Sequence, residues 1–194
     1  MPYDMPTELG RDLAQYRKGE NMNTSTAKHL DNSTVAECKA ALDTVISTLL
    51  KTHSEQLIAG ADIELVIYGV NNNLHVRDYL LGLPSEIGLG GSFNVVTVMR
   101  NLCAQLNYET MALDTVLASY CVMNGEPDTA ERLLTKGLEN KYPLAGLIYR
   151  VIKAGWPAGA YSSIAEELHP KVIAELSTTV NELLNESLRD SEVA

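Results

Sequence analysis

Residues 107–155 read NYETMALDTVLASYCVMNGEPDTAERLLTKGLENKYPLAGLIYRVIKAG, and this stretch decides the fold because its apolar spacing and its helix ends agree. A first set of apolar residues recurs at the spacing of one helix face: Leu113, Val116, Leu117, Tyr120 and Cys121. The spacing predicts a helix that begins near Thr110. The Asn124-Gly125 pair predicts its end, because it tolerates the positive φ of a helix C-terminus.

Two more helices are expected in the same stretch. Glu126, Pro127 and Asp128 suit a first turn, where proline is accepted and acidic groups face the positive end of the helix dipole. The stripe of this second helix is Ala130, Leu133, Leu134, Gly137 and Leu138. Pro143 predicts a third helix ending at Gly155, whose stripe is Leu144, Leu147, Ile148, Val151 and Ile152. Because the connections are short, these helices are expected to pack as antiparallel neighbours.

The first two helices come close to the tetratricopeptide pattern. Gly125, Ala130, Leu134 and Gly137 lie near its key positions, and Pro143 comes one residue late. Gly137 stands where that pattern usually has Ala, so it would let two helices approach closely, at about 1 kcal/mol of helix propensity. Stacked repeats need about three units, and one is matched here. We therefore interpret the stretch as a tetratricopeptide-like helix pair, with ordinary core helices as the alternative.

A wider pattern joins two parts of the chain. It consists of Gly125-Glu126, Ala130, Leu138, Leu147 and Ala154-Gly155-Trp156-Pro157, with Val76-Arg77-Asp78-Tyr79-Leu80-Leu81 upstream. On these residues, Met111–Pro157 resembles the C-terminal part of an uncharacterised actinobacterial and actinophage family labelled "domain of unknown function". The strand-rich opening of that family is missing here. The resemblance implies helical packing and allows a phage source, but it implies no activity.

Composition indicates a single helical domain. The chain has 194 residues, of which 45% are hydrophobic, and its aromatic residues are nine Tyr, one Trp and one Phe. A core built mainly from aliphatic residues favours helix packing. We predict a mainly α fold: a tetratricopeptide-like bundle of about eight helices in antiparallel pairs. Residues 1–32 are expected to form a flexible N-terminal arm, and residues 33–194 one helical domain with an acidic C-terminal helix.

Charge and cysteine usage narrow the class of partner. The net charge of −10 disfavours nucleic acid and anionic membrane surfaces and favours a basic protein partner. From Glu166 to Ala194 there are seven acidic and two basic residues. Cys38, Cys103 and Cys121 form no CxxC or Cys/His cluster, which predicts neither a disulfide framework nor zinc. With no signal peptide pattern, we expect a cytoplasmic protein, in the host cytoplasm if it is phage-encoded.

The ends of the remaining helices are predicted from helix-capping residues and from residues that interrupt helices. Thr34-Val35-Ala36-Glu37 matches a capping box and predicts a helix to Ala59. Ile63–Tyr68 is expected to be helical, with a strand as the alternative because the segment is β-prone. Gly88–Ser92 is expected to be a loop with Ser92 capping the next helix; it lacks the spacing of a phosphate-binding fingerprint. Ser162 or Ser163 should cap a helix through Leu168, and His169-Pro170 should restart it.

Candidate binding residues are aromatic or lie in the last helix. Partner anchors are expected among Tyr120, Tyr142, Tyr149 and Trp156. A coiled-coil-like seam is formed by Ile173, Leu176, Val180 and Leu183, which would pack on the protein's own helices or pair with a second copy.

No catalytic, cofactor-binding or metal-binding residue is expected. The four histidines, His29, His53, His75 and His169, stand alone, and no G-x-S-x-G sequence occurs. We predict a non-enzymatic helical module that binds a protein partner, which would be a host protein for a phage adaptor. The alternative is a structural homo-oligomer assembled through the C-terminal helix. A third function, enzymatic or small-ligand binding, would need a polar pocket around Gly88–Ser92.

Overall fold

The chain folds into helices that pack around one central helix. The computed structural model describes residues 32–52 and 58–192, with side chains described for residues 35–52 and 58–177. Within that part there are eight helices and no strand: α2 Asn32–Thr52, α3 Gly60–Asn72, α4 Leu74–Gly82, α5 Pro84–Gln105, α6 Met111–Met123, α7 Pro127–Glu139, α8 Pro143–Lys153 and α9 Ala158–Glu192. The predicted mainly α fold of antiparallel pairs is confirmed. The expected arm, residues 1–32, lies outside the described residues except for Asn32.

Helix α6 is the central helix. All eleven residues from Ala112 to Val122 are buried, because α6 contacts α4, α5, α7, α8 and α9. Leu113 and Val116 belong to the larger apolar cluster, which α2 to α5 complete, whereas Ala118 and Cys121 belong to a smaller one with α7 and α8. The predicted single apolar stripe was therefore too narrow. A nearly charge-free helix buries its whole circumference.

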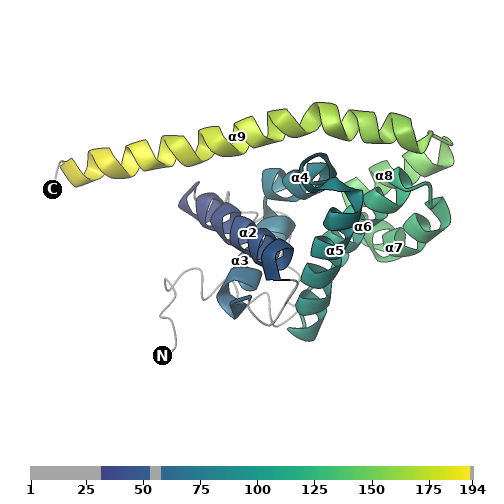
Figure 1. Cartoon of the computed structure of the whole chain (residues 1–194), viewed down its shortest axis with the longest axis horizontal. Helices are drawn as coiled ribbons and strands as arrows, with labels where there is room; N and C mark the ends of the chain where they lie inside the picture. Colours follow the sequence, from purple (N-terminus) through teal and green to yellow (C-terminus); the bar gives the residue numbers. More distant parts are fainter. Residues whose placement is uncertain (1–31, 53–57, 193–194) are drawn as a thin grey trace.

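Helix α9 is the longest element and runs along the whole molecule (Figure 1). It contacts α4, α2, α6 and α5, and its C-terminal end projects past α2 in that view. The inner face recurs at the helical spacing and consists of Ala158, Tyr161, Ser162, Ala165, His169, Val172, Ile173 and Leu176. Leu176 is 1% exposed and completes the larger apolar cluster. One helix therefore joins the beginning of the fold to its end.

Four consecutive helices, α5 to α8, end in the same backbone motif. Each has a residue of positive φ just past its end, namely Asn107, Gly125, Lys141 and Gly155. At α6, Glu126 N–H donates to Cys121 C=O (2.8 Å) and Gly125 N–H donates to Val122 C=O (3.1 Å), which is the Schellman pattern. The equivalent pair of bonds closes the other three helices. The predicted ends at Asn124-Gly125 and Gly155 are confirmed.

Gly137 brings α7 against α8. A Cβ added there would lie 2.7 Å from Ala145 Cβ and 3.5 Å from the Thr115 hydroxyl oxygen, so only glycine fits the observed spacing. This confirms the close helix approach predicted at Gly137.

Several predicted boundaries were wrong. The Ile63–Tyr68 segment lies inside α3, so the strand alternative is wrong. The predicted loop at Gly88–Ser92 is a kink inside α5 at Gly88 (φ 75°, ψ 159°). Ser92 is buried and donates its hydroxyl to Gly88 C=O (2.9 Å), so it does not cap the helix.

Helix α9 also differs from its predicted form. It begins at Ala158, and the hydroxyls of Ser162 and Ser163 donate to carbonyls one turn earlier instead of capping. Pro170 lies within the continuous helix. Its missing N–H is tolerated because Pro170 is exposed on the solvent side of α9, where water can serve the freed carbonyl.

Candidate functional site

The four predicted aromatic anchors do not form one site. Tyr120 is fully buried; its hydroxyl donates to Leu80 C=O, and its ring meets Phe93 edge-on with centroids 5.5 Å apart. It therefore fastens α6 to α4 and offers no surface to a partner. The physical reason is the complete burial of α6, which one-face periodicity did not predict.

Tyr142 and Tyr149 are half-buried and already have cationic neighbours. Arg77 donates to the Tyr142 hydroxyl (3.4 Å) and places its guanidinium carbon 5.9 Å from the ring centroid. Lys153 Nζ lies 5.0 Å from the Tyr149 ring centroid and 2.6 Å from the Glu131 carboxylate. Of the four predicted anchors, Trp156 alone is exposed.

The described half of the predicted seam faces inward. Leu176 is buried in the protein's own core, and Ile173 is partly buried against it. Val180 and Leu183 belong to the part of α9 whose side chains are not described.

Four of the exposed large apolar side chains of the described residues lie on α8, on α9 or in the connection between them. Among the described residues, four large apolar side chains of this kind follow one another: Leu147 (50% exposed), Trp156 (46%), Ile164 (39%) and Leu168 (49%). We call them the α8–α9 apolar set. Ile164 and Leu168 are one turn apart and share a face of α9. The other three, Leu50, Leu74 and Leu106, lie singly on different elements.

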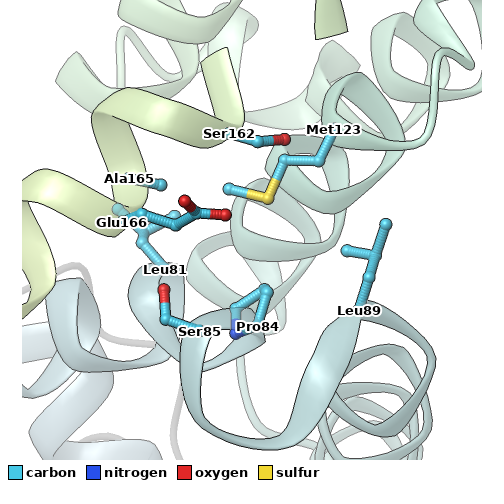
Figure 2. A pocket seen from close by; sticks show the side chains of 8 residues that line it. All are labelled: Leu81, Pro84, Ser85, Leu89, Met123, Ser162, Ala165 and Glu166. Carbon is cyan, nitrogen blue, oxygen red and sulfur yellow. The ribbon is translucent and has the colours of Figure 1, made fainter. Parts of the chain in front are cut away.

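A pocket opens beside the opposite flank of α9, where α4, α5 and α6 meet it (Figure 2). Its volume is about 180 Å³. It is lined by Leu81, Pro84, Ser85, Leu89, Met123, Ser162, Ala165 and Glu166. The Gly88–Ser92 segment, around which a small-ligand function would need a polar pocket, contributes only Leu89 to this lining.

A buried histidine stands next to this pocket. His169 is 3% exposed; its Nε2 lies 2.9 Å from Glu86 Oε1, and the Tyr79 hydroxyl donates to Glu86 Oε2 (2.9 Å). Gly82 makes room for the ring, because a Cβ there would lie 2.0 Å from His169 Nδ1. Burial, followed by the hydrogen bond and charge of Glu86, raises the pKa of Tyr79. We call His169, Glu86 and Tyr79 the histidine cluster.

The contacts of this histidine favour one tautomer of the neutral ring. Nδ1 is buried without a hydrogen-bond partner, so a proton there would be an unsatisfied donor. The tautomer with hydrogen on Nε2 instead donates to Glu86. His169 was predicted to stand alone, because the sequence around it holds no other ligand-type pair. The sequence does carry a signal for the burial of His169, because this residue falls between Ala165 and Val172 on the inner face of α9.

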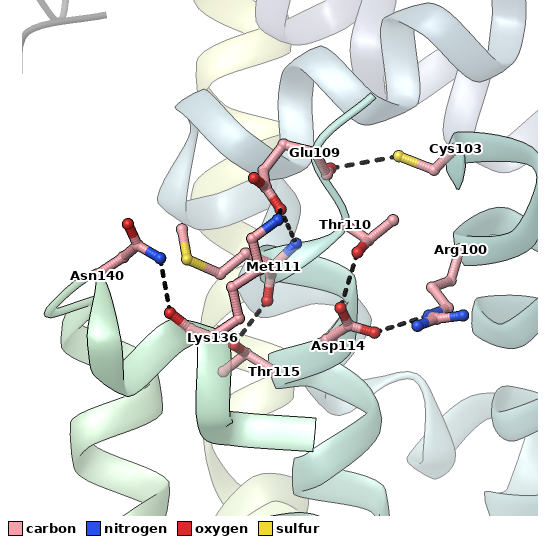
Figure 3. A network of polar contacts seen from close by, with 9 residues as sticks. All are labelled: Arg100, Cys103, Glu109, Thr110, Met111, Asp114, Thr115, Lys136 and Asn140. Atoms are coloured by element: carbon pink, nitrogen blue, oxygen red, sulfur yellow. Dashed lines mark hydrogen bonds and ion pairs between the residues drawn. The ribbon is translucent and has the colours of Figure 1, made fainter. Parts of the chain in front are cut away.

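A second polar network ties the α5–α6 turn to α7 (Figure 3). Arg100 Nε lies 2.7 Å from Asp114 Oδ1, and the Thr110 hydroxyl donates to Asp114 Oδ2 (2.8 Å). Lys136 Nζ lies 2.9 Å from Glu109 Oε1, while Cys103 Sγ donates to Glu109 C=O (3.3 Å). Every charged group in this network is paired with a group of opposite charge, so the network serves to hold the α5–α6 turn in place.

The three cysteines, Cys38, Cys103 and Cys121, are free and buried. Burial raises the pKa of Cys38 and of Cys103 to about 12 and that of Cys121 to about 11, so all three thiols stay protonated at neutral pH. No group of three or more His, Cys, Asp or Glu side chains in the described segments is arranged to hold a metal ion. The helices described here include none with the length and apolarity needed to cross a bilayer.

No protein-family model, curated protein or solved structure matches this chain.

Proposed function

We propose that this chain is a non-enzymatic helical module that binds a basic protein partner through the α8–α9 apolar set. The observation that carries the proposal is the concentration of exposed Leu147, Trp156, Ile164 and Leu168 within one connection and its two flanking helices. Exposed aromatic and aliphatic side chains of this kind are efficient anchors at protein interfaces. The other exposed leucines are isolated, as is usual on a protein surface.

The charge of the chain supports a basic partner. The net charge is −10, and Glu167 is exposed on α9 between Ile164 and Leu168. An apolar contact flanked by a carboxylate suits an amphipathic helix that carries Lys or Arg beside its apolar face. If the chain is phage-encoded, that partner is a host protein. The three unpaired thiols support a reducing cytoplasm as the compartment.

The helix pair α6–α7 is a weaker candidate for the partner surface. A tetratricopeptide-type groove requires exposed faces on its first helices, and α6 is buried on all sides. The tetratricopeptide likeness therefore stays a prediction, and the proposal rests on α8 and α9 instead.

The test uses the single tryptophan as reporter. A synthetic amphipathic peptide of Leu and Lys is titrated into the protein while Trp156 emission is followed. Saturable binding with a blue shift is expected, because Trp156 is half-exposed and would become desolvated. Leu168→Ser should weaken binding at least about tenfold. Leu74→Ser is the matched control, since Leu74 is 64% exposed but lies on α4. Equal effects of both substitutions, or no saturable binding, would refute the proposal.

A homo-oligomer through α9 is the second candidate. The C-terminal end of α9 favours it, because in Figure 1 it projects past α2 and no other described helix runs beside it there. The charge opposes it: residues 166–194 carry seven acidic and two basic residues, which would repel in a parallel pair. Light scattering at several concentrations separates the two functions. A monomer supports partner binding, and a concentration-independent dimer that disappears on truncation after Ser177 supports the oligomer.

A further inference from the structure

The pocket in Figure 2 is built from segments far apart in the sequence. Leu81 comes from the end of α4, Pro84 and Leu89 from the start of α5, and Met123 from the end of α6. The first half of α9 closes the remaining side with Ser162, Ala165 and Glu166.

The lining combines an apolar wall with acceptor groups. Five side chains are apolar: Leu81, Pro84, Leu89, Met123 and Ala165. The polar ones are Ser85, Ser162 and Glu166, and the lining includes no Lys, Arg or His. The Ser162 hydroxyl hydrogen is used in its bond to Ala158 C=O (3.1 Å), so its oxygen is left to accept. The pocket therefore favours a ligand that donates hydrogen bonds.

Glu166 supplies the charge. Within the described residues its carboxylate makes no hydrogen bond or ion pair, and Figure 2 shows the two oxygens directed toward the middle of the ring of lining side chains. An ionised carboxylate accepts hydrogen bonds and donates none. A cationic group is its natural complement, and a net charge of −10 raises the local concentration of small cations.

The histidine cluster keeps the two sides of the pocket together. Glu86 follows Ser85 on α5, and His169 lies one turn after Glu166 on α9. The contact between His169 Nε2 and Glu86 Oε1 (2.9 Å) thus joins the two helices beside the pocket. Gly82 lets the His169 ring pack against α4. A pocket held in this way is largely formed before a ligand arrives.

The volume limits the size of the ligand. A cavity of about 150 Å³ lined by apolar side chains is large enough for a benzene ring. The 180 Å³ here leaves room for one six-membered ring and a small head group.

We propose that this pocket binds a small organic ammonium ion: a single ring or short branched alkyl group against Leu81, Leu89 and Met123, with a primary ammonium on the Glu166 carboxylate. The ammonium donates to Glu166 and to the Ser162 oxygen. An anion would be repelled by the ionised Glu166 carboxylate, and the lining holds no cationic side chain to offset that repulsion. This inference is independent of the protein partner, because the pocket and the Ile164–Leu168 face lie on opposite flanks of α9.

The test is a titration with cyclohexylammonium, followed by the NMR signal of the Met123 methyl group. That signal is assigned by its loss in Met123→Leu. A saturable shift is expected with cyclohexylammonium, and affinity at least about tenfold lower is expected for cyclohexanol and cyclohexanecarboxylate, which lack the positive charge.

Two neighbouring carboxylates provide a matched comparison. Glu166→Gln should weaken cyclohexylammonium binding at least about tenfold, whereas Glu167→Gln, which removes the same charge next to the pocket but not in its lining, should leave it within about twofold. Ala165→Leu should abolish binding by filling the space, with circular dichroism confirming that the protein is folded. Absence of a saturable shift, equal binding of the carboxylate probe, or equal effects of the two Gln variants would overturn the proposal.

Discussion

Gly137 and Gly82 each let one helix pack closely on another, but their partners lie at very different distances along the chain. Gly137 meets Ala145 on the next helix, across a short turn. Gly82 meets His169 on α9, at the far end of the fold. The first contact joins two consecutive helices, and their short connection already predicts from the sequence that they are neighbours. The second depends on how the whole chain is arranged. Local patterns therefore specify which helices form, whereas distant contacts specify what becomes buried.

The largest effect is expected at Gly137. Gly137→Leu should lower the free energy of unfolding by about 3 kcal/mol, because the added side chain has to displace Ala145 and Thr115 in a packed interface. Chemical denaturation measures this loss. Gly146→Ala is the control on the same helix pair: a Cβ at Gly146 meets nothing within 4 Å, so it should be neutral or slightly stabilising. If both variants behave alike, the close approach is not the cause.

The distant contact should respond with a smaller loss that depends on its partner. Gly82→Ala should lower the free energy of unfolding by about 2 kcal/mol, because the new Cβ collides with the His169 ring. In a His169→Ala background the added loss should be smaller, since most of the colliding atoms are gone. A double-mutant cycle measures the coupling. Additive losses would show that the two residues act independently.

The buried thiols make the larger cluster sensitive to alkali. Their pKa is higher in the folded protein than in the unfolded chain, so the folded state holds more protons. The contribution of these thiols to the free energy of unfolding is fully present below pH 9.0 and is lost as the pH rises toward about 12. In that window, the ionisation of Cys38 and the ionisation of Cys103 should each lower the free energy of unfolding by about 1 kcal/mol per pH unit. Denaturation at pH 8 to 10.5 tests this, and Cys38→Ser should reduce the slope.

The smallest effect concerns a helix end. Lys141 adopts φ 55° where the equivalent residues after α6 and α8 are glycine. The left-handed conformation disfavours a side chain by about 1 to 2 kcal/mol, partly offset by the greater freedom of glycine in the unfolded chain. Lys141→Gly should therefore stabilise the protein by about 0.5 kcal/mol in thermal denaturation. Gly125→Ala should have the opposite sign; stabilisation by both would contradict this account.

The helices between residues 107 and 155 could be predicted from the sequence, because the signals that mark their ends are local. Gly125, Pro143 and Gly155 mark helix ends by backbone chemistry that operates over a few residues, and the helices between them formed as expected. The prediction that Ser92 caps a helix after a loop was wrong. A Gly-rich run can equally form a kink within one helix when its neighbours are buried. At Pro170 the helix continued because its inner face is packed on both sides of the proline.

The candidate site was less predictable. Tyr120 was assigned to a partner surface because one-face periodicity left its other neighbours unknown, and α6 proved to be surrounded. His169 was set aside because Glu86 and Tyr79 lie far away in sequence. The pocket beside it draws on four helices, and no short pattern encodes such a meeting. Trp156, by contrast, lies in a turn after Gly155, where exposure follows from the local chain.

The position of α9 also affects how the protein is made. Leu176 and His169 fill spaces in a body formed mainly from α2 to α6, yet they are among the last described residues to be synthesised. Until they leave the ribosome, the nascent chain lacks the apolar side chain of Leu176 in the larger cluster and the contact of His169 with Glu86. Synthesis that is interrupted before His169 would therefore yield products that chaperones and proteases can recognise.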